Sequence, residues 1–149
     1  MSSVGTTDID YLTALFDPSR SYENIIKQFN SGILYYYNDP TEFIQSINMN
    51  KNKQLTAFIP SECATQLVPK LNELVQIDSI YIDNNDNIKD LAKKYTKVRL
   101  FNKNVLGSQL ILVQIKNLTN QGDAYKQSND NSLANLYYNE ATELCKGLS

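Results

Sequence analysis

The sequence predicts an α/β fold in which a five-stranded, mostly parallel, doubly wound sheet is followed by a C-terminal helical hairpin. Short apolar runs rich in β-branched and aromatic residues alternate with amphipathic stretches, and turn-forming residues stand at each junction. Beyond residue 106 the strand-like runs cease and only helical periodicity remains. Strands joined by helices pair in parallel and bury both faces of the sheet, whereas two consecutive helices with a short connection pack antiparallel.

The first part of the chain contains two predicted strands and a helix. Residues 11–16 are a continuous apolar run that stops at Asp17, which predicts a buried strand and a turn. Residues 21–30 carry apolar side chains at steps of three and four, and Gly32 can adopt the left-handed conformation that ends helices. Residues 33–37, with three tyrosines, predict the second strand.

A second helix and a third strand are expected next. Asp39 is placed to cap the helix, Pro40 suits its first position, and Glu42 stands where it can complete a capping box. Residues 54–60 predict the third strand because they are apolar, β-branched and closed by a proline. Ser61 is the expected N-cap of the helix that follows this strand.

The rest of the α/β domain is predicted from shorter segments. The helix after the third strand is expected to extend to Val75. Residues 78–82 predict the fourth strand, and residues 83–86 are turn-forming. Apolar positions in residues 88–95 form one helical face, and residues 98–101 predict a short, partly polar fifth strand of the kind found at sheet edges.

Five strands in this sequence order predict the flavodoxin-like arrangement, with spatial order 2-1-3-4-5. Such sheets bind ligands in a crevice at the carboxyl ends of the first and third strands, where the order reverses. Asp17, Ser61, Glu62 and Asn84 follow strands at this edge and are the candidate crevice residues. Asp17 is also a typical turn residue, so a purely structural role competes with a binding role.

Composition argues against several classes of function. A net charge of −2 gives no basic field for nucleic acid or an anionic membrane. No apolar run approaches the roughly 20 residues of a membrane helix and the first residues do not resemble a signal peptide, so we expect a cytoplasmic protein. With no histidine, Ser-His and Cys-His nucleophile pairs and HExxH zinc sites are excluded. We therefore expect no enzyme, no catalytic residue, no cofactor and no metal site.

We expect a flexible N-terminus at residues 1–9, the α/β domain at residues 10–106 and the hairpin at residues 107–149. The polar residues 127–132 form the expected loop between the two helices. The hairpin resembles one tetratricopeptide repeat, in which small and aromatic residues alternate at fixed spacing. The matching positions are Gly122, Tyr125, Ala134, Tyr138 and Ala141.

The resemblance to a tetratricopeptide repeat is incomplete and implies a role. Gln121 and Leu118 stand where that repeat usually has leucine and tryptophan. A solitary repeat cannot bury both of its faces. We therefore expect the hairpin to bind a protein through Tyr125 and Tyr138, either a second copy in a homodimer or a different partner. An ordinary helical hairpin packed on the α/β domain is the competing interpretation.

Two further segments resemble a known family. Residues 67–82 read Leu-Val-Pro-x-x-x-x-Leu-Val-Gln-x-x-Ser-Ile-Tyr-Ile, and residues 91–98 read Leu-Ala-Lys-Lys-Tyr-x-Lys-Val. They resemble the N-terminal α/β module of invertebrate multidomain proteins, which precedes tetratricopeptide repeats and sometimes an ADP-ribosyltransferase domain. The chain departs from that family at residues 60–64, where a Ser-Gly-Ser-Leu-Gly turn is usual, and at Leu91, where tryptophan is usual. The resemblance therefore implies an interaction module and does not carry over a ligand site or transferase activity.

The sequence favours a non-catalytic interaction or signalling adaptor and leaves three alternatives open. A phosphoacceptor receiver domain shares the topology, and Asp17 and Lys103 suit two of its roles, but the third strand ends in Pro60 where an aspartate is needed. A TIR-like nucleotide-sensing domain also shares it, with Glu62 or Glu73 as the candidate glutamate, although a solvated helix face explains both. The third alternative is the front part of a larger ADP-ribosyltransferase-type protein.

Overall fold

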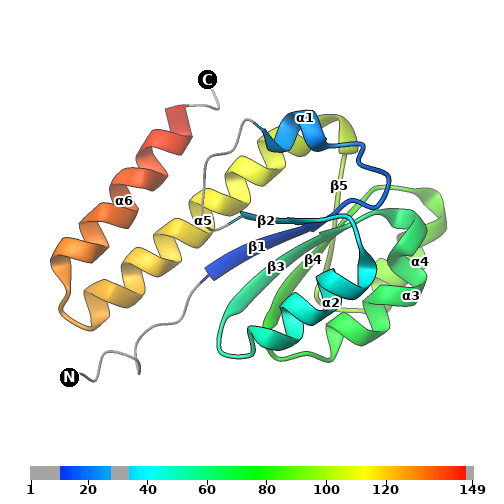
Figure 1. The fold of residues 1–149 in the computed structure, drawn as a ribbon, viewed down its shortest axis with the longest axis horizontal. Coiled ribbons are helices and arrows are strands. Elements are labelled where there is room, and N and C mark those ends of the chain that lie inside the picture. Colours follow the sequence, from blue (N-terminus) through cyan, green and yellow to red (C-terminus); the bar gives the residue numbers. More distant parts are fainter. Residues whose placement is uncertain (1–10, 28–33, 147–149) are drawn as a thin grey trace.

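The computed structural model describes residues 11–27 and 34–146, and within them five strands form a single sheet (Figure 1). The strand order is β2-β1-β3-β4-β5, and every neighbouring pair runs parallel. The predicted flavodoxin-like order 2-1-3-4-5 is therefore confirmed. The expectations for residues 1–9 and for Gly32 lie outside the described residues.

Helices and strands alternate through the α/β part of the chain. The strands are β1 (Tyr11–Phe16), β2 (Leu34–Tyr37), β3 (Gln54–Ile59), β4 (Ile77–Asp83) and β5 (Val98–Phe101). The helices are α1 (Glu23–Ile26), α2 (Pro40–Met49), α3 (Ser61–Asn72), α4 (Lys89–Lys94), α5 (Leu106–Gln127) and α6 (Asn131–Lys146). Two short 3-10 helices, η2 (Asp86–Ile88) and η3 (Lys103–Val105), precede α4 and α5.

Helix α3 is shorter than expected. The prediction carried it to Val75, but it ends at Asn72, and Val75 lies in the connection with 82% of its surface exposed. The chain has to turn here because Ile77 already begins β4 and is almost fully buried. Turn hydrogen bonds from Leu74 N to Leu71 O and from Ile77 N to Leu74 O make this reversal.

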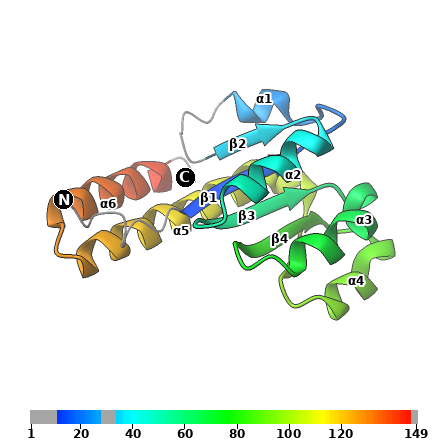
Figure 2. The same ribbon diagram turned by 60° about the horizontal axis from the view of Figure 1, so that its bottom comes forward.

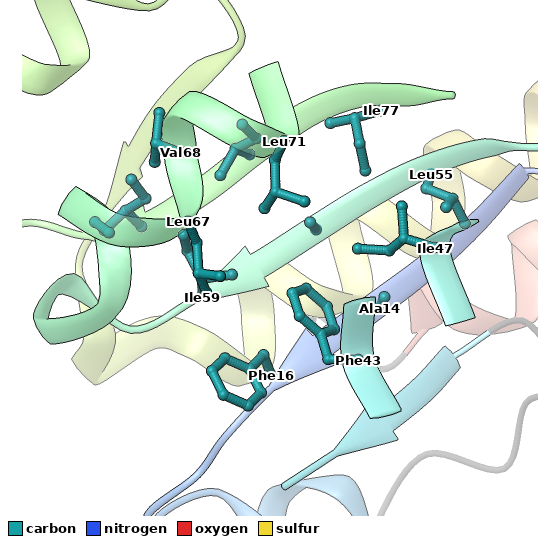
Figure 3. Packing of buried hydrophobic residues seen from close by; sticks show 14 of the residues in the cluster. Ala14, Phe16, Phe43, Ile47, Leu55, Ile59, Leu67, Val68, Leu71 and Ile77 are labelled. Carbon is teal, nitrogen blue, oxygen red and sulfur yellow. The ribbon is translucent and has the colours of Figure 1, made fainter. Parts of the chain in front are cut away.

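One face of the sheet is covered by α2, α3 and α4, and the larger hydrophobic core lies between these helices and the sheet (Figure 3). Alternate residues of each strand point to this face, as the pleat requires. Phe43 of α2 stacks on Phe16 of β1 with ring centroids 5.0 Å apart. The other contributors labelled in Figure 3 are Ala14, Ile47, Leu55, Ile59, Leu67, Val68, Leu71 and Ile77.

The opposite face is covered by α1 and α5, and its core is smaller. Leu15, Phe58 and Tyr81 are neighbours in register on β1, β3 and β4. Leu106, Leu110 and Val113 of α5 pack against this part of the sheet. All three α5 side chains are at most 4% exposed, so the first half of α5 is an integral cover of the sheet.

The second half of α5 meets the sheet through polar side chains. Thr13, Thr56 and Ser79 are the preceding row in register, and each is buried. Asn117 of α5 donates from Nδ2 to Thr13 Oγ1 at 2.9 Å. Gln114, one turn earlier, is fully buried, and within the described residues neither atom of its amide has a hydrogen-bond partner. This part of the interface is therefore less well satisfied than the apolar part.

Helix α6 lies outside the layered α/β body and runs antiparallel to α5 (Figures 1 and 2). Among the described elements, α5 is the one against which α6 makes extensive contact. The predicted hairpin is confirmed, but its first helix also belongs to the sheet's second core. No helix among the described residues is both long and apolar enough to cross a bilayer.

Candidate functional site

The carboxyl ends of the parallel strands bring three of the four candidate crevice residues to one edge of the sheet. Asp17 follows β1, and Ser61 and Glu62 begin α3 directly after β3. Asp83, the last residue of β4, joins them. The two aspartates at this edge accept hydrogen bonds from neighbouring backbone N–H groups and hydroxyls.

Asp17 is a buried anchor of the β1–α1 connection. Its side chain is 2% exposed, and its carboxylate accepts hydrogen bonds from Ser21 N at 3.1 Å, Tyr22 N at 2.8 Å and the Tyr36 hydroxyl at 2.6 Å. Its peptide carbonyl accepts from Asn38 Nδ2 at 2.9 Å. Both carboxylate oxygens are therefore engaged by the protein itself, as expected for a turn residue.

Two tyrosines respond to the negative charge at this edge. Burial and the hydrogen bond to Asp17 raise the pKa of Tyr36 to about 12. Burial also raises the pKa of Tyr22, and the nearby carboxylates of Asp83, Asp17 and Glu62 raise it further. The Tyr22 ring thus lies within electrostatic reach of three acidic groups, and the edge is anionic at neutral pH.

The expectation that Ser61 caps α3 is wrong. Pro60 occupies the N-cap position, Ser61 is the first helical residue, and no side chain of the cap bonds to the helix. Asp83 supplies the missing acceptor instead, taking hydrogen bonds from Ser61 N at 2.8 Å and from Ser61 Oγ at 3.2 Å. A carboxylate at a helix N-terminus is favourable because it satisfies a free N–H and complements the helix dipole.

The remaining groups of the first turn of α3 are not activated. Glu62 is exposed, and Cys63 is half-buried. Burial raises the pKa of the Cys63 thiol, and the charge of Glu62 raises it further. The thiol is therefore kept protonated at neutral pH, which is the opposite of what a nucleophilic cysteine requires.

Asn84, the fourth candidate, follows Asp83 at the end of β4 but lines a different surface depression from the other three. Its backbone N donates to Phe101 O at 2.6 Å, and the depression is shallow and lined by residues 84–87. Asn85 caps η2 by accepting from Asn87 N at 2.8 Å. The depression is polar and open, and it does not include Asp17, Ser61 or Glu62.

The edge is poorly suited to phosphate or metal ligands. The backbone N–H groups that could cradle a phosphate, at Ser21, Tyr22 and Ser61, are already bonded to the carboxylates of Asp17 and Asp83. Within the part of the chain that is described, no three His, Cys, Asp or Glu side chains are grouped so that they could hold a metal ion. The sequence analysis did not identify Asp83 or Tyr36 as part of this edge. Asp83 could have been found, because it is an acidic residue directly after the predicted strand at residues 78–82.

The two tyrosines expected to contact a partner take part in the hairpin's own packing. The Tyr125 ring stacks on Tyr137 with centroids 5.5 Å apart and an interplanar angle of 16°. The Tyr138 hydroxyl donates to Asp123 Oδ1 at 2.5 Å. A Cβ atom added to Gly122 would lie 2.6 Å from Tyr138 Cε1, so the glycine is required for the close approach of the two helices.

The chain matches no protein-family model, no curated protein and no solved structure at a significant level.

Proposed function

We propose that the chain is a non-catalytic, cytoplasmic protein-interaction or adaptor module whose C-terminal hairpin binds another protein or a second copy. The observation that carries the proposal is the position of α6, which packs on α5 and extends beyond the α/β body (Figure 2). The free thiols of Cys63 and Cys145 support a reducing compartment.

The carboxyl edge of the sheet supports the same proposal, because few of its polar groups are free to bind a ligand. Ligand-sensing domains of this topology keep groups free in the crevice between the first and third strands. In this chain Asp17 and Asp83 bond to the neighbouring backbone N–H groups, which leaves little for a nucleotide to bind. The hairpin is therefore the better candidate for recognition.

Leu136 and Leu112 offer a matched test of the hairpin. Each is 51% exposed, the first on α6 and the second on α5. The wild-type chain, Leu136→Glu and Leu112→Glu would serve as baits in an extract of the source cells, with untagged chain added to detect self-association. Retained proteins are then quantified by mass spectrometry. Glutamate is a good helix former, so neither change should unfold its helix, and circular dichroism checks this.

We expect at least one protein to be retained equally by the wild type and by Leu112→Glu. The amount that Leu136→Glu retains should be at least tenfold lower, which corresponds to a loss of about 1.4 kcal/mol in binding free energy. If the untagged chain itself is retained by the wild type and by Leu112→Glu but not by Leu136→Glu, the partner is a second copy. If Leu136→Glu retains every protein that the wild type retains, α6 is not the binding element and the proposal fails.

A further inference from the structure

One flank of α6 carries an apolar stripe that α5 covers only in part. We call it the α6 stripe, and it consists of Leu133, Leu136, Tyr137 and Leu144. Leu136 is 51% exposed and the other three are half-buried. Residues three and four apart share one face of a helix, so these positions line up along about three turns.

The α6 stripe borders the face that packs on α5, and Tyr137 touches both because its ring stacks on Tyr125 of α5. That face is formed by Ala134 and Ala141, which are buried, and by Tyr138, which lies against Gly122. Leu136 follows Ala134 by two residues, which is a rotation of about 200° around the helix. Leu136 therefore points away from α5.

Glu140 lies within the α6 stripe and lacks an ionic partner in the described structure. It is exposed, and it stands three residues after Tyr137 and four before Leu144. No basic residue stands three or four positions from it on either side, at 136, 137, 143 or 144. The other glutamate of the helix, Glu143, is paired with Lys146 at 3.0 Å. An anion in an apolar surface gains most from a partner that supplies a cation.

A second copy of the chain fits this surface poorly. A two-fold dimer places the same surface of each copy against the other. Glu140 lies within two residues of the middle of the stripe, which spans residues 133–144. A parallel two-fold pairing would set the two Glu140 carboxylates against each other, where like charges repel. An antiparallel pairing about the middle of the stripe would set each Glu140 against Tyr137 of the other copy, and the stripe has no lysine or arginine to pair with it.

An extended peptide added to the sheet at β5 is also disfavoured. Arg99 folds back along this edge strand, and its guanidinium donates to Thr96 O at 2.6 Å and to Val98 O at 3.1 Å. These carbonyls are then no longer free to pair with an added strand. A helix needs no such edge, because its backbone groups are satisfied internally and it docks through side chains at i, i+3, i+4 and i+7.

We propose that the α6 stripe binds an amphipathic helix of a different protein that carries a lysine or arginine opposite Glu140. This inference depends on the proposed function, because it names the kind of partner that the hairpin recognises. The apolar residues supply contact area, and Glu140 selects the charge of the helix.

Two designed helical peptides test the proposal on the full chain. They have the same length and the same apolar face, and they carry either lysine or glutamate at the positions beside that face. Binding is followed by fluorescence anisotropy of labelled peptide. The lysine peptide should bind the wild-type chain roughly tenfold more tightly than the glutamate peptide. Glu140→Lys should reverse this preference, Leu136→Glu should abolish binding of both peptides, and Leu112→Glu should change neither.

Each other outcome is informative. If Leu136→Glu abolishes binding but Glu140→Lys leaves the preference unchanged, the charge selection is overturned while the hairpin remains the binding element. If neither peptide binds, or Leu136→Glu and Leu112→Glu behave alike, the α6 stripe is not a docking surface. If light scattering shows a concentration-dependent dimer that Leu136→Glu abolishes, the occupant is a second copy and the proposal is wrong.

Discussion

Tyr36 shows how a single buried carboxylate changes the chemistry of its neighbours. Its hydroxyl donates to Asp17 at 2.6 Å, and deprotonation would place two negative charges beside each other. Burial and this bond together raise its pKa to about 12. The folded state therefore favours the neutral phenol more strongly than the unfolded chain does, where tyrosine titrates near pH 10.

The first prediction concerns the alkaline stability of the chain. Because the pKa of Tyr36 is raised on folding to about 12, its contribution is fully present below about pH 10 and is lost as the pH rises from there to about 12. The difference in tyrosinate absorbance between wild type and Tyr36→Phe should show a component with a midpoint near 12. A midpoint near 10 would contradict the buried hydrogen bond. At neutral pH Tyr36→Phe should lower the free energy of unfolding by about 1 to 2 kcal/mol.

Gly122 is required by a contact and not by its backbone conformation. The Cβ of an alanine at this position would meet the Tyr138 ring at 2.6 Å. Alanine is the better helix former, so in an isolated helix the change would be stabilising. Here we expect Gly122→Ala to destabilise the hairpin by about 1 to 3 kcal/mol, because either the Tyr138 ring has to leave its place or the two helices have to separate.

Tyr138→Ala provides the control for Gly122. When the ring is absent, Gly122→Ala should cost much less than in the wild-type chain, and the difference is the coupling energy of the pair. Urea unfolding of the wild type, the two single variants and the double variant measures it. Additive effects would mean that Gly122 and Tyr138 do not meet.

At the scale of the elements, α3 shows how one strand end stabilises a neighbouring helix. Asp83 of β4 accepts from both the N–H and the hydroxyl of Ser61. Asp83→Ala removes both acceptors together with a favourable charge at the helix N-terminus, and should cost about 1 to 2 kcal/mol. Ser61→Ala keeps the 2.8 Å bond from its backbone N and should cost less than half as much. The reverse order in urea unfolding would mean that Ser61 is itself the cap.

Helix α5 contains a residue that its surroundings do not satisfy. The Gln114 amide is fully buried without a hydrogen-bond partner among the described residues, and a buried amide in that position costs free energy. Gln114→Met keeps the length of the side chain and removes the polar atoms, so it should stabilise the fold by about 1 to 2 kcal/mol. Asn117→Leu is the comparison, because it loses the bond to Thr13 and should destabilise. Loss of stability in Gln114→Met would show that the amide has a partner.

At the scale of the whole molecule, the strand order was predictable because it depends on local patterns. Apolar runs such as residues 11–16 and 54–59 stand out in the sequence, and the rules for parallel sheets then leave few strand orders, of which 2-1-3-4-5 is a common one. The contacts at the carboxyl edge were not predictable in the same way. Ser61 and Asp83 are 22 residues apart in the sequence, and their contact depends on how the ends of β3 and β4 align.

The role of α5 was harder to predict because its apolar positions serve two surfaces. Leu106, Leu110 and Val113 face the sheet, whereas Gly122 faces α6. One helical periodicity in the sequence therefore contains two overlapping patterns. The sequence changes from strand-like runs to helical periodicity after residue 106, which is why a boundary was expected there. That boundary separates α5 from the sheet that it covers.

Two truncations test whether the folding unit includes α5. A chain that ends at Ser128 loses α6 and keeps every side chain that covers the sheet, so we expect it to unfold cooperatively in urea. A chain that ends at Val105 also loses Leu106, Leu110 and Val113, which are at most 4% exposed. Burial of three such side chains contributes roughly 5 to 9 kcal/mol, which is comparable to the whole stability of a domain of this size. The shorter chain should therefore show no cooperative transition and little dispersion in its amide NMR spectrum. If it folds cooperatively, the α/β domain ends before α5, and the hairpin is an independent unit.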